Sequence, residues 1–295
     1  MRTTKVKPPF EVKEIEAKGI LTKCGIPGID WAVNPYIGCR FGCKYCYASF
    51  MGRFVGKKVA DWGEYVYPKI NAPELLKNEV EKKLPHKGKG KEIFLSSVTD
   101  PYQGLEAKYK LTRQCLSVLA DWGFAGTLSI LTKSNLVTRD IDILKRFQKA
   151  VVGLTVTSAD DGISRYFEKY APPVSERFEA LKKLNRAGIK TYAFIGPLLP
   201  HFVADEAGLE KVFQKLAEVG TKDIYVEHLN LSSYIRGRLM DEMKGTDKKI
   251  VAKFYSSQSK AYREDLEKLV KKLVDKYHMT LLLDLVIFHR EFRPI

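Results

Sequence analysis

The sequence predicts an α/β fold in which a parallel sheet is covered by helices. Short apolar runs alternate with amphipathic helical patterns along the chain, and this alternation repeats six times in series. The chain has 295 residues, of which 45% are hydrophobic, so one sizeable core is expected. Serial units of this kind form either an open doubly wound sheet or a partial barrel. In both, the functional site lies at the carboxyl ends of the strands.

Six apolar runs rich in Val, Ile and Leu are predicted as buried parallel strands, because such strands read as near-continuous apolar segments. In chain order they are residues 31–37, 93–97, 127–132, 151–157, 189–195 and 223–228. One further strand is expected within residues 10–21, in a basic segment that leads into the first unit.

Six helical patterns follow or fill the gaps between these runs. They cover residues 72–84, 109–122, 140–147, 174–187, 204–219 and 248–277. Pro73 stands at an early position of the first helix, where its missing N–H costs nothing. Gly188 and Gly220 follow the fourth and fifth helices, and glycine is a typical stop at a helix C-terminus.

The formal net charge is +15, from 50 basic and 35 acidic residues. Such a positive field attracts phosphates and steers nucleic acid to a protein surface. The lysines are dispersed in pairs such as 82–83 and 271–272, however, which fits solvated helix faces and the Lys- and Glu-rich surfaces of thermophilic proteins equally well. Charge alone therefore leaves nucleic-acid binding open.

A membrane span is not expected. The longest apolar run covers residues 279–288, and Asp284 interrupts it, whereas a helix that crosses a bilayer needs about 20 apolar residues. Residues 1–10 are basic and then Pro-rich, without the apolar centre of a signal peptide. We expect a soluble cytoplasmic protein.

Three of the five cysteines fall within eight residues, at Cys39, Cys43 and Cys46. Clustered thiols in a cytosolic chain favour a metal site over disulfides, and thiolates suit iron–sulfur clusters or zinc. A closed zinc site needs four ligands, but Cys24 lies 15 residues upstream and His86 lies 40 residues downstream. Three thiolates on a four-iron cube would leave one iron open to a ligand.

The spacing Cys-x3-Cys-x2-Cys, with the aromatic Tyr45 before the last cysteine, resembles the radical S-adenosylmethionine superfamily. The surrounding segments are similar to its branch related to spore photoproduct lyase. These segments are residues 34–47, 95–103, 131–134 and 196–200, and the likeness covers roughly residues 30–230.

The resemblance implies a partial (βα)6 TIM-like barrel over residues 31–230, with an N-terminal extension at 1–30 and a C-terminal helical extension at 231–295 packed on the core. It implies a 4Fe–4S cluster that binds S-adenosylmethionine at its open iron and splits it into methionine and a 5′-deoxyadenosyl radical, which abstracts a hydrogen atom from the substrate. It also implies an external one-electron reductant, such as a flavodoxin or ferredoxin.

On the adenosyl side of the cofactor, the resemblance implies roles for five residues. Tyr45 would pack on the adenine, and the backbone at Gly196 and Pro197 would approach it. Thr155 and Thr157 would contact the ribose hydroxyls. A core aromatic, a plain turn and ordinary β-branched strand residues are the structural alternatives.

On the methionyl side, Ser97 and Thr99 would contact the amino group, with strand-end capping as the alternative. Lys133 would pair with the carboxylate, and a lysine at a buried strand end needs such a charge partner. Arg177 would also reach the carboxylate, unless it pairs with Glu176 or Glu179 nearby.

The sequence departs from photoproduct lyase at Ser97, where the lyase has a cysteine that returns a hydrogen atom to the product radical. A hydroxyl is a poor hydrogen-atom donor, so the lyase reaction itself is in doubt. Cys115 is expected to be a small core hydrophobe, and Cys24 would donate only if the N-terminal segment folds over the barrel mouth. Residues that could meet a substrate there are Asp100, Tyr102, Gln103, Glu227 and His228.

Three functions remain open. The first is a radical enzyme that acts on nucleic acid, and the second is a radical enzyme that acts on a protein, a peptide or a small molecule. The third is a non-catalytic iron–sulfur or zinc protein, which would require a fourth ligand on the metal.

Overall fold

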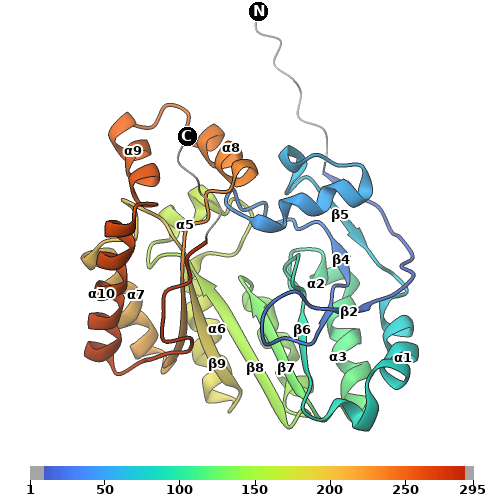
Figure 1. Ribbon diagram of the computed structural model, residues 1–295. Helices are drawn as coiled ribbons and strands as arrows, with labels where there is room; N and C mark the ends of the chain where they lie inside the picture. The colour runs from blue at the N-terminus through green and yellow to red at the C-terminus, as the bar shows by residue number, and fades with distance from the viewer. Residues whose placement is uncertain (1–9, 290–295) are drawn as a thin grey trace, which may run out of the picture.

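A computed structural model describes residues 10–289 of the chain, so the outermost parts of the two predicted extensions, residues 1–9 and 290–295, lie outside the described residues. The central element is an eight-stranded sheet, open at both edges (Figure 1). Its strands in spatial order are β2 (Leu21–Lys23), β3 (Trp31–Val33), β6 (Glu92–Leu95), β7 (Thr127–Thr132), β8 (Lys149–Val156), β9 (Lys190–Leu198), β10 (Asp223–His228) and β11 (Thr280–Leu281). Only β2 is antiparallel to its neighbour.

A three-stranded sheet lies beyond the carboxyl ends of the main strands. It contains β1 (Glu11–Val12), β5 (Tyr65–Pro68) and β4 (Tyr36–Ile37) in that order. Together with the 3₁₀ helix η1 (Tyr47–Val55), it forms the blue lobe at the upper right of Figure 1. This lobe carries the cysteine segment.

Most of the helices pack on the outer face of the main sheet, but those that carry Phe167, Ile235 and Phe254 pack around the cysteine segment. Ten α-helices are described in all. They are α1 (Ala72–Lys83), α2 (Glu106–Tyr109), α3 (Leu111–Trp122), α4 (Ile141–Leu144), α5 (Asp161–Phe167), α6 (Val174–Arg186), α7 (Glu206–Glu218), α8 (Ser233–Glu242), α9 (Lys248–Ser256) and α10 (Lys260–Tyr277). The short 3₁₀ helices η2 (Val59–Asp61), η3 (Pro85–Gly88) and η4 (Asn135–Asp140) complete the set.

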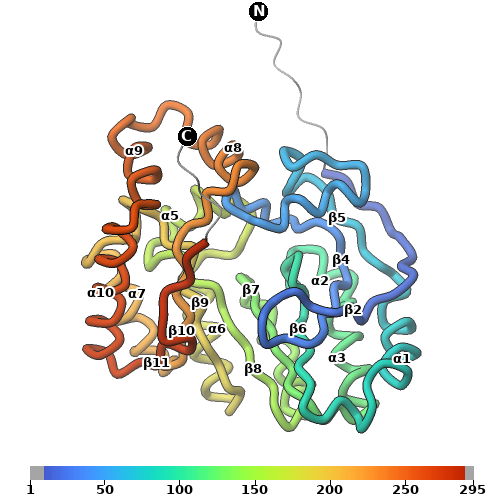
Figure 2. Tube along the Cα trace, in the orientation of Figure 1, coloured from blue at the N-terminus to red at the C-terminus, as the bar shows by residue number. Residues whose placement is uncertain are grey.

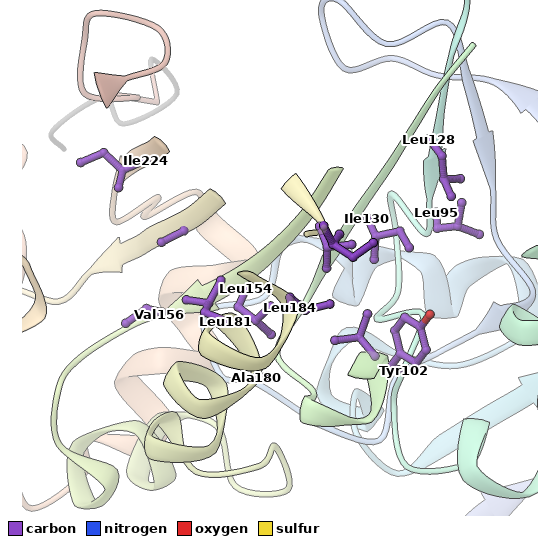
Figure 3. Packing of buried hydrophobic residues seen from close by; sticks show 14 of the residues in the cluster. Leu95, Tyr102, Leu128, Ile130, Leu154, Val156, Ala180, Leu181, Leu184 and Ile224 are labelled. Atoms are coloured by element: carbon purple, nitrogen blue, oxygen red, sulfur yellow. The ribbon is translucent and has the colours of Figure 1, made fainter. Parts of the chain in front are cut away.

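Burial between the sheet and these helices fixes which way each strand faces. Leu154 and Val156 of β8 lie against Leu181 and Leu184 of α6 (Figure 3), and all four side chains are almost fully buried. Burying a side chain of this size contributes about 1.5–3 kcal/mol. Since successive strand residues face opposite sides, the alternate residues of the strands face the barrel interior.

The predicted α/β fold is confirmed: the six predicted parallel strands and the additional β11 alternate with helices, and within the described residues the sheet does not close into a full barrel. The strands predicted at 127–132 and 223–228 have the bounds that the structure shows. The strand predicted at 31–37 is wrong as one element, because the chain leaves the main sheet at Asn34-Pro35 and continues as β4 in the small sheet.

Three other predicted elements differ from the structure. The helix predicted at 248–277 is two helices, α9 and α10, because residues 257–259 turn the chain and Ser259 caps the second helix by accepting a hydrogen bond from the N–H of Tyr262 at 3.3 Å. The helix predicted at 140–147 is only the single α-helical turn α4, preceded by η4. The strand expected within 10–21 is the two-residue β1, and Leu21 already belongs to β2.

Within residues 10–289, no helix is both long enough and apolar enough to cross a bilayer.

Candidate functional site

The cysteine segment is a loop between β4 and η1, and its first residue, Gly38, is fixed by close contacts. Gly38 has φ +85°, and a Cβ there would lie 2.5 Å from the backbone oxygen of Tyr65, so only glycine fits. The hydroxyl of Thr99 donates a hydrogen bond to the Gly38 carbonyl at 2.6 Å. Thr99, predicted to contact the cofactor, thus ties the end of the second predicted strand to the start of the loop.

The three thiols of the loop share one buried environment. Cys39 and Cys43 are buried, and Cys46 is partly buried. Burial raises the pKa of each of the three thiols, and neighbouring thiols of the loop raise the pKa of Cys39 and Cys43 further. The Lys133 ammonium acts in the opposite direction and lowers the pKa of Cys43 and Cys46. A bound cation would relieve this cost, because thiolates are the metal-binding form.

The donor set fits a four-iron cluster. Three soft thiolates at one buried place are the ligands that iron–sulfur clusters take. No group of three or more His, Cys, Asp or Glu side chains within residues 10–289 is arranged for one metal ion. A cube of four irons spaces its ligands farther apart than a single ion does, so the loop is compatible with the larger group.

Lys133 faces the cysteine loop from the end of β7. Leu128 and Ile130 of this strand point into the helix-covered core, so Lys133, an odd number of residues further on, lies on the interior face. Its Nζ lies 5.7 Å from the centre of the Tyr45 ring. The described residues show no hydrogen bond or ion pair of this ammonium. Burial raises the pKa of the nearby Asp100 carboxyl, and the Lys133 charge offsets part of this rise. Because the half-buried ammonium forms no ion pair, it is available to an incoming carboxylate.

Tyr45 is fixed by a fully buried ion pair. Its hydroxyl donates a hydrogen bond to Glu168, whose other carboxylate oxygen accepts one from the Arg177 guanidinium. Glu168 and Arg177 are 1% and 0% exposed. Burial raises the pKa of the Glu168 carboxyl, and Arg177 offsets part of this rise.

Arg177 lies behind Tyr45. Besides Glu168, its guanidinium donates hydrogen bonds to the carbonyl oxygens of Thr155 at 3.0 Å and Pro172 at 2.8 Å. The partner is therefore neither Glu176 nor Glu179, the two acids considered from the sequence. The contact of Arg177 with a cofactor carboxylate stays a prediction, and the structure shows a supporting role through Tyr45.

The interior face of β8 and β9 carries the residues predicted for the adenosyl group. Thr155 and Thr157 alternate with the helix-facing Val156. Thr157 is fully buried, yet its hydroxyl has no hydrogen-bond partner among the described residues. A Cβ on Gly196, whose peptide bond to Pro197 is cis, would lie 2.9 Å from the Cβ of Glu227.

The residues expected to meet a substrate divide into two groups. Asp100 is held by the hydroxyl of Thr132 at 2.6 Å and the backbone N–H of Lys133 at 2.8 Å, so it joins the ends of two strands. Tyr102 and Gln103 are buried next to it.

Glu227 and His228 at the end of β10 form the second group. Only Glu227 faces the interior, and Nε2 of His289 lies 2.9 Å from its carboxylate. His228 faces the other way and contacts the Ser257 carbonyl at 3.0 Å. Burial lowers the pKa of His228 to about 4. It is therefore neutral near pH 7 and belongs to the packing of the C-terminal helices.

Ser97 and Cys24 are both partly buried, and each lies near Tyr47. The Ser97 carbonyl accepts a hydrogen bond from the hydroxyl of Tyr47, and its side chain lies 3.5 Å from the Asn34 amide. Cys24 lies just beyond β2. Burial raises the pKa of Tyr47, and the nearby groups of Glu227 and Cys24 raise it further. Cys115, in contrast, is buried in the main core, as the sequence predicted.

Four site residues could not be found from the sequence: Glu168, Arg238, Tyr47 and His289. Glu168 is 123 positions from Tyr45 in the sequence, and Arg238 is 195 positions from Cys43, whose carbonyl oxygen it contacts. No local motif marks such contacts. Only the unusual type of residue, a charge that folding must bury, could have suggested that Glu168 has a partner.

The chain is similar to known proteins over most of its length. The family model of the radical SAM superfamily matches residues 33–228. An uncharacterized protein of Methanocaldococcus jannaschii is 39% identical over 76% of this chain and 80% of its own length. The spore photoproduct lyase of Bacillus subtilis is 24% identical, over 67% of this chain and 54% of the lyase.

The fold is also that of a solved spore photoproduct lyase in complex with a dinucleoside spore photoproduct. The TM-score is 0.66 at 14% identity, over 94% of this chain and 81% of the lyase chain. At this identity the likeness concerns the fold. The family model extends from the last residue of β3 to the end of β10 and includes the cysteine loop and Lys133. The chain therefore belongs to the radical SAM superfamily.

Proposed function

We propose that the protein binds a 4Fe–4S cluster through Cys39, Cys43 and Cys46 and uses S-adenosylmethionine to abstract a hydrogen atom from nucleic acid. One observation supports the proposal above the others: the Lys133 ammonium, which forms no ion pair within residues 10–289, lies 5.7 Å from the Tyr45 ring and acts on the thiols of Cys43 and Cys46, so a methionyl carboxylate could pair with it. When bound and reduced, the cluster supplies the electron that splits S-adenosylmethionine into methionine and a 5′-deoxyadenosyl radical.

The side chains of this protein bind and orient the cofactor. Lys133 would neutralise the carboxylate, and Tyr45, held by Glu168, would pack on the adenine. The unpartnered hydroxyl of Thr157 would accept or donate a hydrogen bond at the ribose. Thr99 would keep the cysteine loop against the end of β6 through the Gly38 carbonyl.

Nucleic acid is the proposed substrate class because of charge and kinship. The net charge of +15 favours a polyanion. A relative at 24% identity is named spore photoproduct lyase, and a solved lyase of the same fold holds a dinucleoside. The electron would come from a separate flavodoxin-like or ferredoxin-like carrier in the cytoplasm.

A protein, peptide or small-molecule substrate is the second candidate, and Ser97 is the observation that favours it. Ser97 takes the place of the lyase cysteine in the sequence, and its carbonyl and side chain are both engaged by neighbours. Because this position has no thiol, it cannot return a hydrogen atom to the product radical. Another group must therefore quench that radical.

One labelling experiment tests the proposed function. The anaerobically reconstituted protein is mixed with dithionite, S-adenosylmethionine and uniformly deuterated DNA or RNA. We expect 5′-deoxyadenosine to form and to carry deuterium, because the radical takes its hydrogen atom from the nucleic acid.

Two outcomes would decide against parts of the proposal. Unlabelled 5′-deoxyadenosine, formed at the same rate with and without either polymer, would favour the second candidate. An intact cluster that yields no 5′-deoxyadenosine would contradict the enzyme itself. As a control, binding of each polymer is measured at increasing salt, where a steep loss of affinity is expected.

A further inference from the structure

Helix α8 covers the cysteine loop from the C-terminal side of the chain. Its apolar residues Ile235 and Leu239 are fully buried in the same cluster as Cys39 and Cys43. Figure 2 shows the orange tube of α8 next to the blue tube of the segment after the cysteines. The helix follows β10, beyond the last strand that the family model matches.

Three polar contacts join α8 to the loop and to the residue that follows it. The hydroxyl of Tyr234 donates a hydrogen bond to the carbonyl of Tyr47 at 3.1 Å. Lys44 forms an ion pair of 2.7 Å with Glu242 at the other end of the helix.

The third contact comes from the middle of the helix, where Nη2 of Arg238 donates a hydrogen bond to the carbonyl of Cys43 at 3.1 Å. The contacts thus span the length of the helix and reach residues 43–47, which include Cys43 and Cys46. They tie the loop to a segment outside the strands that the family shares.

Arg238 brings a partly buried positive charge to this place. Its Nη1 is shielded from solvent and has no hydrogen-bond partner among the described residues. Burial lowers the pKa of Arg238, whereas the nearby thiols of Cys46 and Cys43 raise it. Arginine remains charged under such conditions. Within residues 10–289, no acidic side chain forms an ion pair with Arg238. The nearby Glu242 carboxylate raises its pKa but pairs with Lys44 instead.

The guanidinium is anchored at the Cys43 carbonyl through Nη2, and its shielded Nη1 stays free to act on a group bound at the loop. A protein tunes an iron–sulfur cluster through the net charge and the hydrogen bonds around its sulfurs. The shielded Nη1 of Arg238 and its proximity to two of the three thiols meet both conditions. An electron that enters the cluster adds a negative charge, and a fixed guanidinium close by stabilises that reduced state.

We propose that Arg238 is a positioning residue that holds the Cys43 part of the loop and raises the reduction potential of the cluster. This inference rests on the proposed function, because it requires that the loop binds a redox-active cluster. It deepens that function, since α8 then makes the cluster easier for an external carrier to reduce.

The test compares three variants of the full reconstituted chain: Arg238→Gln, Arg238→Lys and the control Arg236→Gln. Arg236 lies on the same helix, and no hydrogen bond or ion pair of its side chain is seen within residues 10–289. The midpoint potential of the cluster is measured by a redox titration followed by electron paramagnetic resonance, without S-adenosylmethionine. Iron and sulfide content and the melting temperature are measured in parallel.

For Arg238→Gln we expect a more negative potential. At a fixed poise, the ratio of reduced to oxidised cluster should fall about tenfold, which corresponds to about 59 mV for a one-electron couple. Arg238→Lys should recover most of the potential, since it keeps the charge, and Arg236→Gln should match the wild type.

The inference is overturned if Arg238→Gln keeps both its cluster and the wild-type potential. It is equally overturned if Arg238→Lys is displaced as far as Arg238→Gln, because the charge is then not the cause. Should Arg238→Gln fail to hold a cluster, the potential of Arg238→Lys decides: a wild-type-like value supports the inference, and a strongly lowered value contradicts it. A wild-type chain without a redox-active cluster contradicts the proposed function instead.

Discussion

Replacing Cys39, Cys43 or Cys46 by alanine is expected to abolish cleavage of S-adenosylmethionine. Each thiol is one of the three proposed ligands in the shared buried environment, and the loss of one leaves an iron of the cluster without its thiolate. We expect the rate of 5′-deoxyadenosine formation to fall by more than about a thousandfold. Replacing residues that only orient metal ligands already costs about 10–100-fold in metal affinity or activity, and the loss of a ligand itself costs more. Iron and sulfide content should fall together with the rate.

Cys115→Ala and Cys24→Ala serve as matched controls. Cys115 is buried in the main core, and Cys24 follows β2, outside the cysteine loop. Both variants should retain the iron and sulfide of the wild type. If a single alanine in the loop left the iron content intact, or if Cys24→Ala removed it, the assignment of the three ligands would be wrong.

Replacing Lys133 by methionine is expected to weaken the binding of S-adenosylmethionine while the cluster remains. The ammonium is the unpaired cation beside Tyr45, so its loss leaves a methionyl carboxylate buried without a partner. Truncating one side of a buried charge pair costs about 2–5 kcal/mol, which is at least about 30-fold in affinity. Binding is measured by anaerobic equilibrium dialysis on the reconstituted protein.

Lys169→Met is the control for this variant. The Lys169 ammonium also lies over an aromatic ring, 5.2 Å from the centre of Tyr170, but its side chain is exposed. We expect its affinity to equal that of the wild type. If Lys133→Met bound S-adenosylmethionine as tightly as the wild type at equal iron content, Lys133 would not be the carboxylate partner.

The main sheet could be predicted because its signals are local. The apolar run Thr127–Thr132 is itself the buried strand β7, and the patterns of residues 174–187 and 204–219 carry their own stops at Gly188 and Gly220. The alternation of such units then determines the order of the sheet. Periodicity gave no warning that the chain leaves the main sheet at Asn34-Pro35, although Pro35 cannot donate to a ladder and could have indicated it.

The site could be predicted only where a motif is local or follows a strand. The cysteine spacing and the position of Lys133 after an apolar run have this property. The partners of Tyr45 and Cys43 do not, because Glu168 and Arg238 reach them from distant segments. Arg177 is a further example. The sequence marked it as a site residue, but its partner Glu168 could not be predicted.

The central claim is that three protein thiolates hold a four-iron cluster whose fourth iron remains free for S-adenosylmethionine. Mössbauer spectroscopy of the protein reconstituted with labelled iron, recorded with and without S-adenosylmethionine, tests this claim most directly. We predict one iron site that differs from the other three and changes its spectrum when S-adenosylmethionine is added. Four iron sites that are insensitive to S-adenosylmethionine, or a protein that retains zinc in place of iron, would contradict it.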